Sequence, residues 1–246
     1  MDRARALAAS RDEARRLVGQ AVSEVAPSRR DFAQYVAVGK EDLAVLARLS
    51  REAGQRTIAE LIEYARACDD AEVAALAVAT GPGGLTADEM AAIAAAVTAP
   101  ILRDHFIVDP SQLYFARLHG ADAAVFPAAD LDPTTLHALV TVASSLHMAS
   151  IIEVTSAADI DRVTQLPHVI CGLRCTTADG GLDLERTQQL ARQVSSHYAA
   201  IALPEITSTA EGTALYGFCD AVVAGELLLG GDVTATLEEL RAPQRR

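Results

Sequence analysis

Charged residues end six of the short apolar segments in this chain of 246 residues. They are Arg48, Asp104, Glu153, Arg174, Glu205 and Glu226. Two close carboxylates such as Asp104 and Glu153 would push one pKa upward and could supply an acid and a base near neutral pH. Arg48 and Arg174 could bind a substrate carboxylate through paired hydrogen bonds. The pattern predicts a polar site for acid–base chemistry on a small anion, with Asp104 and Glu153 as its catalytic residues.

Substrate binding is assigned to the two arginines together with Glu205, Glu226 and His105. His105 has a suitable intrinsic pKa, but strand alternation points it away from the centre of the site, so it ranks below the others. An inert alternative stays open, because buried sets of arginine and carboxylate are often only structural. In that case the charges would pair with one another and fill a dead site.

The elements that would position these residues alternate along the chain. Eight segments are predicted as strands: Leu43–Arg48, Ala74–Thr80, Pro100–Phe106, Ala123–Ala128, Ala149–Val154, Val169–Arg174, Ala199–Glu205 and Asp220–Glu226. Odd and even positions of each segment are both apolar, as expected of parallel strands that are buried on both faces. Each is followed by an amphipathic stretch, as repeated βα units require.

Helices are predicted over Thr57–Cys68, Thr86–Val97, Thr134–Leu146, Ser156–Leu166, Asp183–Ser196, Ser208–Tyr216 and Thr234–Leu240. Thr86 and Glu89 have the spacing of a capping box, and Asp109-Pro110 is typical of a helix start. An extra helix, Arg3–Val25, is expected to cap the barrel or fold over its mouth. The predicted fold is α/β: a single (β/α)8 TIM barrel over residues 29–246, preceded by a helical extension over residues 1–28.

Composition narrows the possible functions. The net charge of -12 disfavours binding to nucleic acid. No apolar run is long enough to span a bilayer, and the amino terminus lacks the apolar core of a signal peptide, so a cytoplasmic protein with no membrane partner is expected. The four cysteines are predicted to be buried thiols, and neither a metal nor a cofactor is expected. Lys40 is the one lysine against twenty arginines. Arginine cannot readily give up a proton.

The most specific stretch is Pro100–Ala123, which reads PILRDHFIVDPSQLYFARLHGADA. It resembles the third strand, loop and helix of the indole-3-glycerol phosphate synthase family, the ring-closing decarboxylases of tryptophan biosynthesis. Weaker resemblances are Arg30-Asp31-Phe32 before the first strand and Asp220–Gly225 at the eighth. Ile151-Ile152-Glu153-Val154 resembles the fifth strand, and the resemblance implies that Glu153 is catalytic.

Departures from the family fall on its functional residues. Leu46 and Arg48 stand where the family has a glutamate and a lysine, and the Ser-Pro-Ser loop that follows in the family is missing. Asp104 replaces the lysine that is the family's general acid. Arg174 replaces an asparagine.

On the seventh strand, Leu203-Pro204-Glu205-Ile206 replaces a Glu-Ser-Gly turn. On the eighth, Glu226 follows Gly225 in place of a serine. Glu226 would then lie at a helix amino terminus, where it would repel a phosphate.

Three functions follow. The first is a divergent synthase-like lyase or ring-closing enzyme that acts on a small aromatic or amino-acid-derived anion without phosphate. The second is a catalytically silent barrel that binds a metabolite or a partner enzyme. The third is the parent reaction on an anthranilate-derived ribulose phosphate. Under any of these functions the protein is expected to be a monomer or a homodimer. An open mouth with a cavity would favour the first over the second.

Overall fold

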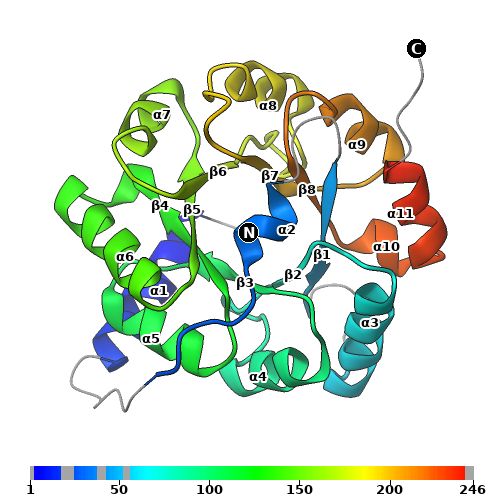
Figure 1. Cartoon of the computed structure of the whole chain (residues 1–246), viewed down its shortest axis with the longest axis horizontal. Coiled ribbons are helices and arrows are strands. Elements are labelled where there is room, and N and C mark those ends of the chain that lie inside the picture. The colour runs from blue at the N-terminus through cyan, green and yellow to red at the C-terminus, as the bar shows by residue number, and fades with distance from the viewer. Residues whose placement is uncertain (1–2, 18–24, 38–42, 52–55, 242–246) are drawn as a thin grey trace.

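Eight parallel strands close into a barrel in the computed structural model, which describes residues 3–17, 25–37, 43–51 and 56–241. Each strand pairs with the next along the chain, and β1 pairs with β8 (Figure 1). The strands are β1 Ala44–Leu49, β2 Ala75–Val78, β3 Ile101–Phe106, β4 Ala123–Pro127, β5 Ala149–Val154, β6 Val169–Leu173, β7 Ala200–Ile206 and β8 Ala221–Ala224. This confirms the predicted (β/α)8 barrel.

Helices surround the barrel and also meet both of its ends. They are α1 Arg3–Leu17, α2 Phe32–Val36, α3 Ile58–Asp70, α4 Ala87–Ala96, α5 Pro110–Leu118, α6 Pro133–Ser145, α7 Ala157–Val163, α8 Leu184–Ala191, α9 Thr209–Leu215, α10 Glu226–Leu229 and α11 Val233–Arg241. A short 3-10 helix covers Ala128–Asp130. Thr86 and Glu89 form the predicted capping box of α4. Asp109 caps α5, which has Pro110 in its first turn.

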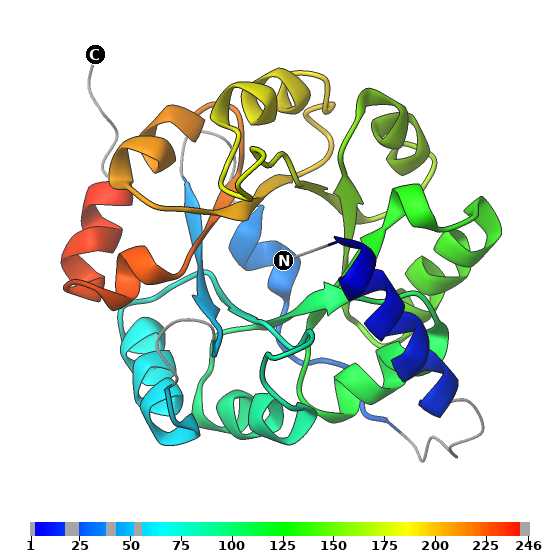
Figure 2. The same ribbon diagram turned by 180° about the vertical axis from the view of Figure 1, so that it is seen from behind.

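The apolar core has two layers, one inside the barrel and one between the strands and the surrounding helices. Phe32 and Val36 of α2 join the inner layer at the amino-terminal ends of the strands. Ala6 and Leu7 of α1 join the same layer from the other end. Figure 1 shows α2 at the centre of the barrel, and Figure 2 shows α1 lying across the opposite rim.

The segment before α2 is held by a buried carboxylate at the start of β4. Asp122 accepts a hydrogen bond from the Ser28 hydroxyl at 2.6 Å and from the Ile101 backbone N–H at 2.9 Å. The Arg30 guanidinium also bonds to Asp122, at 3.3 Å. These bonds satisfy a carboxylate that is almost fully buried, as such a group requires.

The observed boundaries differ from the predicted ones in two places that matter for function. β8 ends at Ala224, so Glu226 begins α10 instead of ending a strand. α1 is observed over Arg3–Leu17, whereas the helix was predicted over Arg3–Val25. Residues 18–24 of the predicted helix lie outside the described part of the chain, and so does Lys40. The described residues contain no helix that is long and apolar enough to cross a membrane.

Candidate functional site

Five of the six charged side chains meet at the carboxyl ends of the strands, where this fold carries its active sites. Arg48 Nε donates to Asp104 Oδ2 at 2.9 Å, and the same guanidinium pairs with Glu205. Arg174 pairs with Glu153, and its Nη2 lies 3.8 Å from Asp104 Oδ1. The five residues therefore form one continuous ion-pair chain, in which arginines separate the carboxylates. We call this set the mouth network.

A residue that the sequence argument missed extends the mouth network. Arg3 of α1 pairs with Glu153 and with Asp130, and its guanidinium lies 5.2 Å from the centre of the Phe106 ring. The Glu153 side chain is 0% exposed, whereas the side chains of its two cationic neighbours are 36% and 28% exposed. The only signal for Arg3 in the sequence was the amphipathic helix itself. Nothing in its pattern indicates which residue reaches the strands.

Protonation in the mouth network differs from the prediction. Two close carboxylates were expected to raise one pKa. Burial does act to raise the pKa of Asp104, but the guanidiniums of Arg48 and Arg174 outweigh it and hold that pKa below its ordinary value. The pKa of Arg48 is raised, because Asp104 and Glu205 outweigh its own desolvation. Asp104 is therefore an ionised partner of two arginines at neutral pH, and its pKa does not rise as one of the two carboxylates was expected to do; its catalytic role stays a prediction.

The carboxylate expected beside Gly225 comes from another residue. Glu226 is exposed at the start of α10 and makes no ion pair with another described residue. Instead, the carboxylate of Glu205 packs against the backbone of Gly225, where a Cβ would collide with it. β7 has a register irregularity between Ala202 and Glu205, which the strand pattern did not indicate. Glu205 thus places a negative charge at the turn between β8 and α10.

His105 points toward α1, as alternation predicted. Its Nε2 lies 3.0 Å from the hydroxyl of Ser10, which donates to the Phe106 carbonyl at 2.7 Å. The hydroxyl proton is used in that second bond, so His105 Nε2–H is the donor to Ser10. Burial and the nearby Arg103 lower the pKa of His105 to about 4. His105 is therefore neutral at physiological pH.

The ion pairs do not close the mouth. A cavity of about 580 Å³ remains, lined by members of the mouth network and by Arg3, Ala6, Phe106, Val125, Leu203 and Arg186. Arg186 belongs to α8 and was also missed, because no strand-end pattern points to it. The site has a feature of each predicted alternative. Its charged side chains pair with one another, as expected of an inert site, and the space above them is open, as expected of a functional one. Such a space can hold a small molecule.

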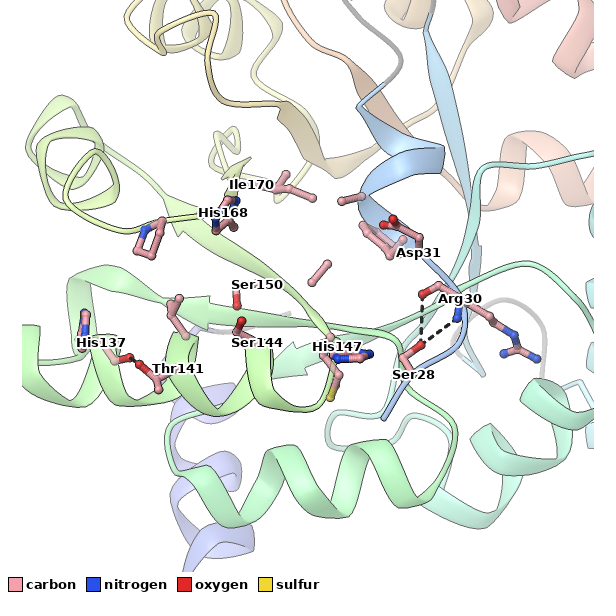
Figure 3. A pocket seen from close by; sticks show the side chains of 16 residues that line it. Ser28, Arg30, Asp31, His137, Thr141, Ser144, His147, Ser150, His168 and Ile170 are labelled. Atoms are coloured by element: carbon pink, nitrogen blue, oxygen red, sulfur yellow. Dashed lines mark hydrogen bonds between the residues drawn. The ribbon is translucent and has the colours of Figure 1, made fainter. Parts of the chain in front are cut away.

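A second cavity, of about 590 Å³, lies at the amino-terminal ends of β5 and β6. Figure 3 shows Ser28, Asp31, His137, His147 and His168 arranged around this cavity. Within the described residues, no three or more His, Cys, Asp or Glu side chains gather closely enough to hold a metal ion. Catalytic groups of this fold lie at the opposite end.

An eight-stranded parallel barrel with its charged side chains gathered at the strand carboxyl ends has the architecture of the (β/α)8 enzymes. The chain belongs to the indole-3-glycerol phosphate synthase family, whose family model matches residues 1–240.

Among its relatives, the indole-3-glycerol phosphate synthase of Mycolicibacterium vanbaalenii is 31% identical over 210 residues, which cover 80% of this chain and 76% of the relative. The one of Mycobacterium sp. (strain KMS) is 32% identical, covering 85% and 70%.

Solved structures confirm the fold alone, because their sequences are distant. The 3-hexulose-6-phosphate synthase of Salmonella typhimurium superposes with a TM-score of 0.66 at 16% identity, covering 81% of this chain and 97% of the other. A tryptophan synthase structure from M. tuberculosis gives a TM-score of 0.63 at 12% identity, covering 88% and 100%.

Proposed function

We propose that this chain performs acid–base lyase or ring-closing chemistry on a small aromatic or amino-acid-derived anion that lacks a phosphate. The observation that carries the proposal is the Glu205 carboxylate packed against Gly225. In barrels of this kind, the loops after the seventh and eighth strands and the short helix that follows often bind phosphate. A carboxylate there repels a dianion and takes up the backbone approach that a phosphate needs.

The proposed chemistry gives each member of the mouth network a role. Glu153 acts as the base, because it is the β5 carboxylate that pairs with Arg3 and Arg174, two arginines that line the cavity. Arg48 and Arg174 stabilise negative charge that develops on the substrate during the reaction, which a guanidinium does without losing a proton. Asp104 and Glu205 hold these arginines in place. His105 stays neutral, lines the cavity and bonds to Ser10 of α1.

The parent reaction needs a proton donor near the sugar carbonyl. At the described mouth, arginine stands at the aligned position of one family lysine and an ionised aspartate at the other. Incubating the purified chain with the anthranilate-derived ribulose phosphate and following indole fluorescence should give no turnover above the protein-free rate. Robust indole formation would refute the proposal and would favour the activity named for the relatives.

The role of Glu153 is tested separately. The wild type is incubated with a panel of aromatic and amino-acid-derived carboxylates, and products are detected by mass spectrometry. Glu153→Gln should lower the turnover of any converted compound about 10²- to 10⁴-fold, the usual contribution of a general base. Glu63→Gln, an exposed carboxylate on α3, is the matched control and should leave turnover unchanged. Equal turnover in Glu153→Gln would remove Glu153 from the mechanism.

A catalytically silent barrel is the second candidate, and one observation favours it. Glu153 already pairs with both Arg3 and Arg174, and these two pairs occupy both of its carboxylate oxygens. If the panel contains compounds that bind but none that is converted, this candidate replaces the first. The monomeric or homodimeric state stays a prediction for either candidate.

A further inference from the structure

The arginines that line the mouth cavity do not all have a carboxylate partner. Four arginines line it, and three of them pair with carboxylates: Arg3, Arg48 and Arg174. The fourth is Arg186. It makes no ion pair with any carboxylate in the described part of the chain, and its Nη2 donates to the Thr155 backbone carbonyl at 2.8 Å. Arg186 is therefore the lining arginine that, among the described residues, has no carboxylate partner.

The position of Arg186 suits a ligand-binding role. It lies on the first turn of α8, directly after the loop that carries Thr176, Gly180 and Gly181 to the cavity wall. The bond to Thr155, at the carboxyl end of β5, fixes one edge of the guanidinium. The side chain is exposed, so its remaining N–H groups can reach an incoming molecule without breaking an existing ion pair.

Other parts of the cavity surface are apolar. Ala6, Phe106, Val125 and Leu203 contribute to its lining and belong to the inner core layer. A ligand that fits has an apolar body for these side chains and an anionic group for Arg186. The single guanidinium of Arg186, which has no carboxylate partner among the described residues, can pair with one negative charge. A dianion would bring an excess charge close to Glu205, which already faces the same space.

We propose that Arg186 anchors the carboxylate of a small aromatic monocarboxylate in the mouth cavity, which makes it a specificity-determining residue for carboxylate over phosphate. The inference rests on the proposed function, in that it takes the mouth to be the site that receives a small anion. It goes further by assigning the anion to α8 and the β5–β6 side of the mouth, away from the turn at Gly225.

Equilibrium binding tests this without any turnover. Benzoate, the uncharged isostere benzamide and inorganic phosphate are titrated into the full chain by calorimetry or by NMR. The wild type should bind benzoate more tightly than either of the other two. Arg186→Gln should weaken benzoate binding by about tenfold or more, the value of a hydrogen bond to a charged group, and should leave benzamide unchanged. Arg186→Lys should retain part of the affinity.

The matched control is Arg66→Gln, which removes the same charge from an exposed site on α3 outside the cavity. It should bind benzoate as the wild type does. Equal benzoate affinity in Arg186→Gln and wild type would overturn the proposal, as would wild-type binding of benzamide or phosphate as tight as that of benzoate, or no benzoate binding at all. Indole formation would refute the proposed function yet leave this binding comparison intact, so the two failures are distinguishable.

Discussion

The packing of α1 on the barrel depends on a buried ion pair between Glu13 and Arg103. The substitution Glu13→Gln should show how much this pair contributes to stability. Both carboxylate oxygens of Glu13 accept from Arg103 Nη2 at 2.7 Å, and Gln112 Nε2 donates to Oε2 at 2.6 Å. The Arg103 side chain is 3% exposed. Glutamine keeps the shape of the side chain but removes the charge, so the substitution leaves a buried guanidinium without its carboxylate.

The expected cost follows from burial. Removing one partner of a fully buried pair costs about 3–5 kcal/mol. The Glu13 side chain is 19% exposed, and water that reaches it lowers the cost, so we expect a loss of about 2–3 kcal/mol in the free energy of unfolding. For a chain of this size, each kcal/mol shifts Tm by about 2–4 °C, so Tm should fall by roughly 4–12 °C.

Asp12→Asn provides the control, because it removes the same charge from the neighbouring residue of the same helix. Asp12 pairs with Arg15 on the surface, where the two side chains are 64% and 77% exposed. Exposed pairs contribute little, so its effect should stay within about 0.5 kcal/mol. Urea unfolding measures both losses, and hydrogen exchange should show faster exchange of the α1 amides in Glu13→Gln than in Asp12→Asn.

Equal unfolding free energies for the two variants, within 0.5 kcal/mol as a rough margin of error, would refute the argument. Such a result would mean that Arg103 finds another partner or that α1 is held by its apolar residues alone. Since α1 also carries Arg3 to Glu153, the same experiment reports how firmly the cavity wall is held.

Three further predictions concern the mouth. Gly225→Ala should lower the free energy of unfolding by about 1 kcal/mol, because the added Cβ displaces the Glu205 carboxylate. In a Glu205→Ala background the same substitution should cost almost nothing, and a double-mutant cycle measures this coupling. The lowered pKa of Asp104 means that its ionised form stabilises the fold above about pH 4, and this stabilisation is lost as pH falls through the folded-state pKa. In Asp104→Asn, the urea midpoint should therefore decrease less steeply as pH is lowered into the acid range. His105 should stay neutral down to about pH 4 in imidazole NMR titrations, and its contribution to stability should decline as pH falls from about 6.5 to that value.

Much of the barrel could be predicted from local patterns. Strands buried on both faces leave continuous apolar runs, and β5 was predicted with its observed bounds. Helix starts carry their own chemistry, as the capping box at Thr86 and the Asp109-Pro110 start illustrate. These features depend on residues within a few positions of one another, so a single sequence contains the information.

The candidate site could be predicted only in part. Strand ends placed five of its carboxylates and arginines together because the fold brings all carboxyl ends to one rim. The irregularity in β7 decides that Glu205 reaches Gly225, and it depends on pairing with β8. Arg3 and Arg186 enter from helices, where long flexible side chains reach the site across many residues of sequence. The hydrophobic periodicity of a helix does not indicate which part of the structure such a side chain reaches.

The loss of lysines and the gain of carboxylates at the mouth are one physical change. Arg48 and Arg174 keep a positive charge at all relevant pH values, so packing them side by side requires anions between them. Asp104 lies between them and stays ionised for that reason. An aspartate held in this way cannot take over the proton transfer of the lysine it replaces. If a mouth arginine reverted to lysine while Asp104 remained, the carboxylate would raise the pKa of the lysine ammonium and make it a weaker acid. Recovering a proton donor would therefore require changing Asp104 together with an arginine.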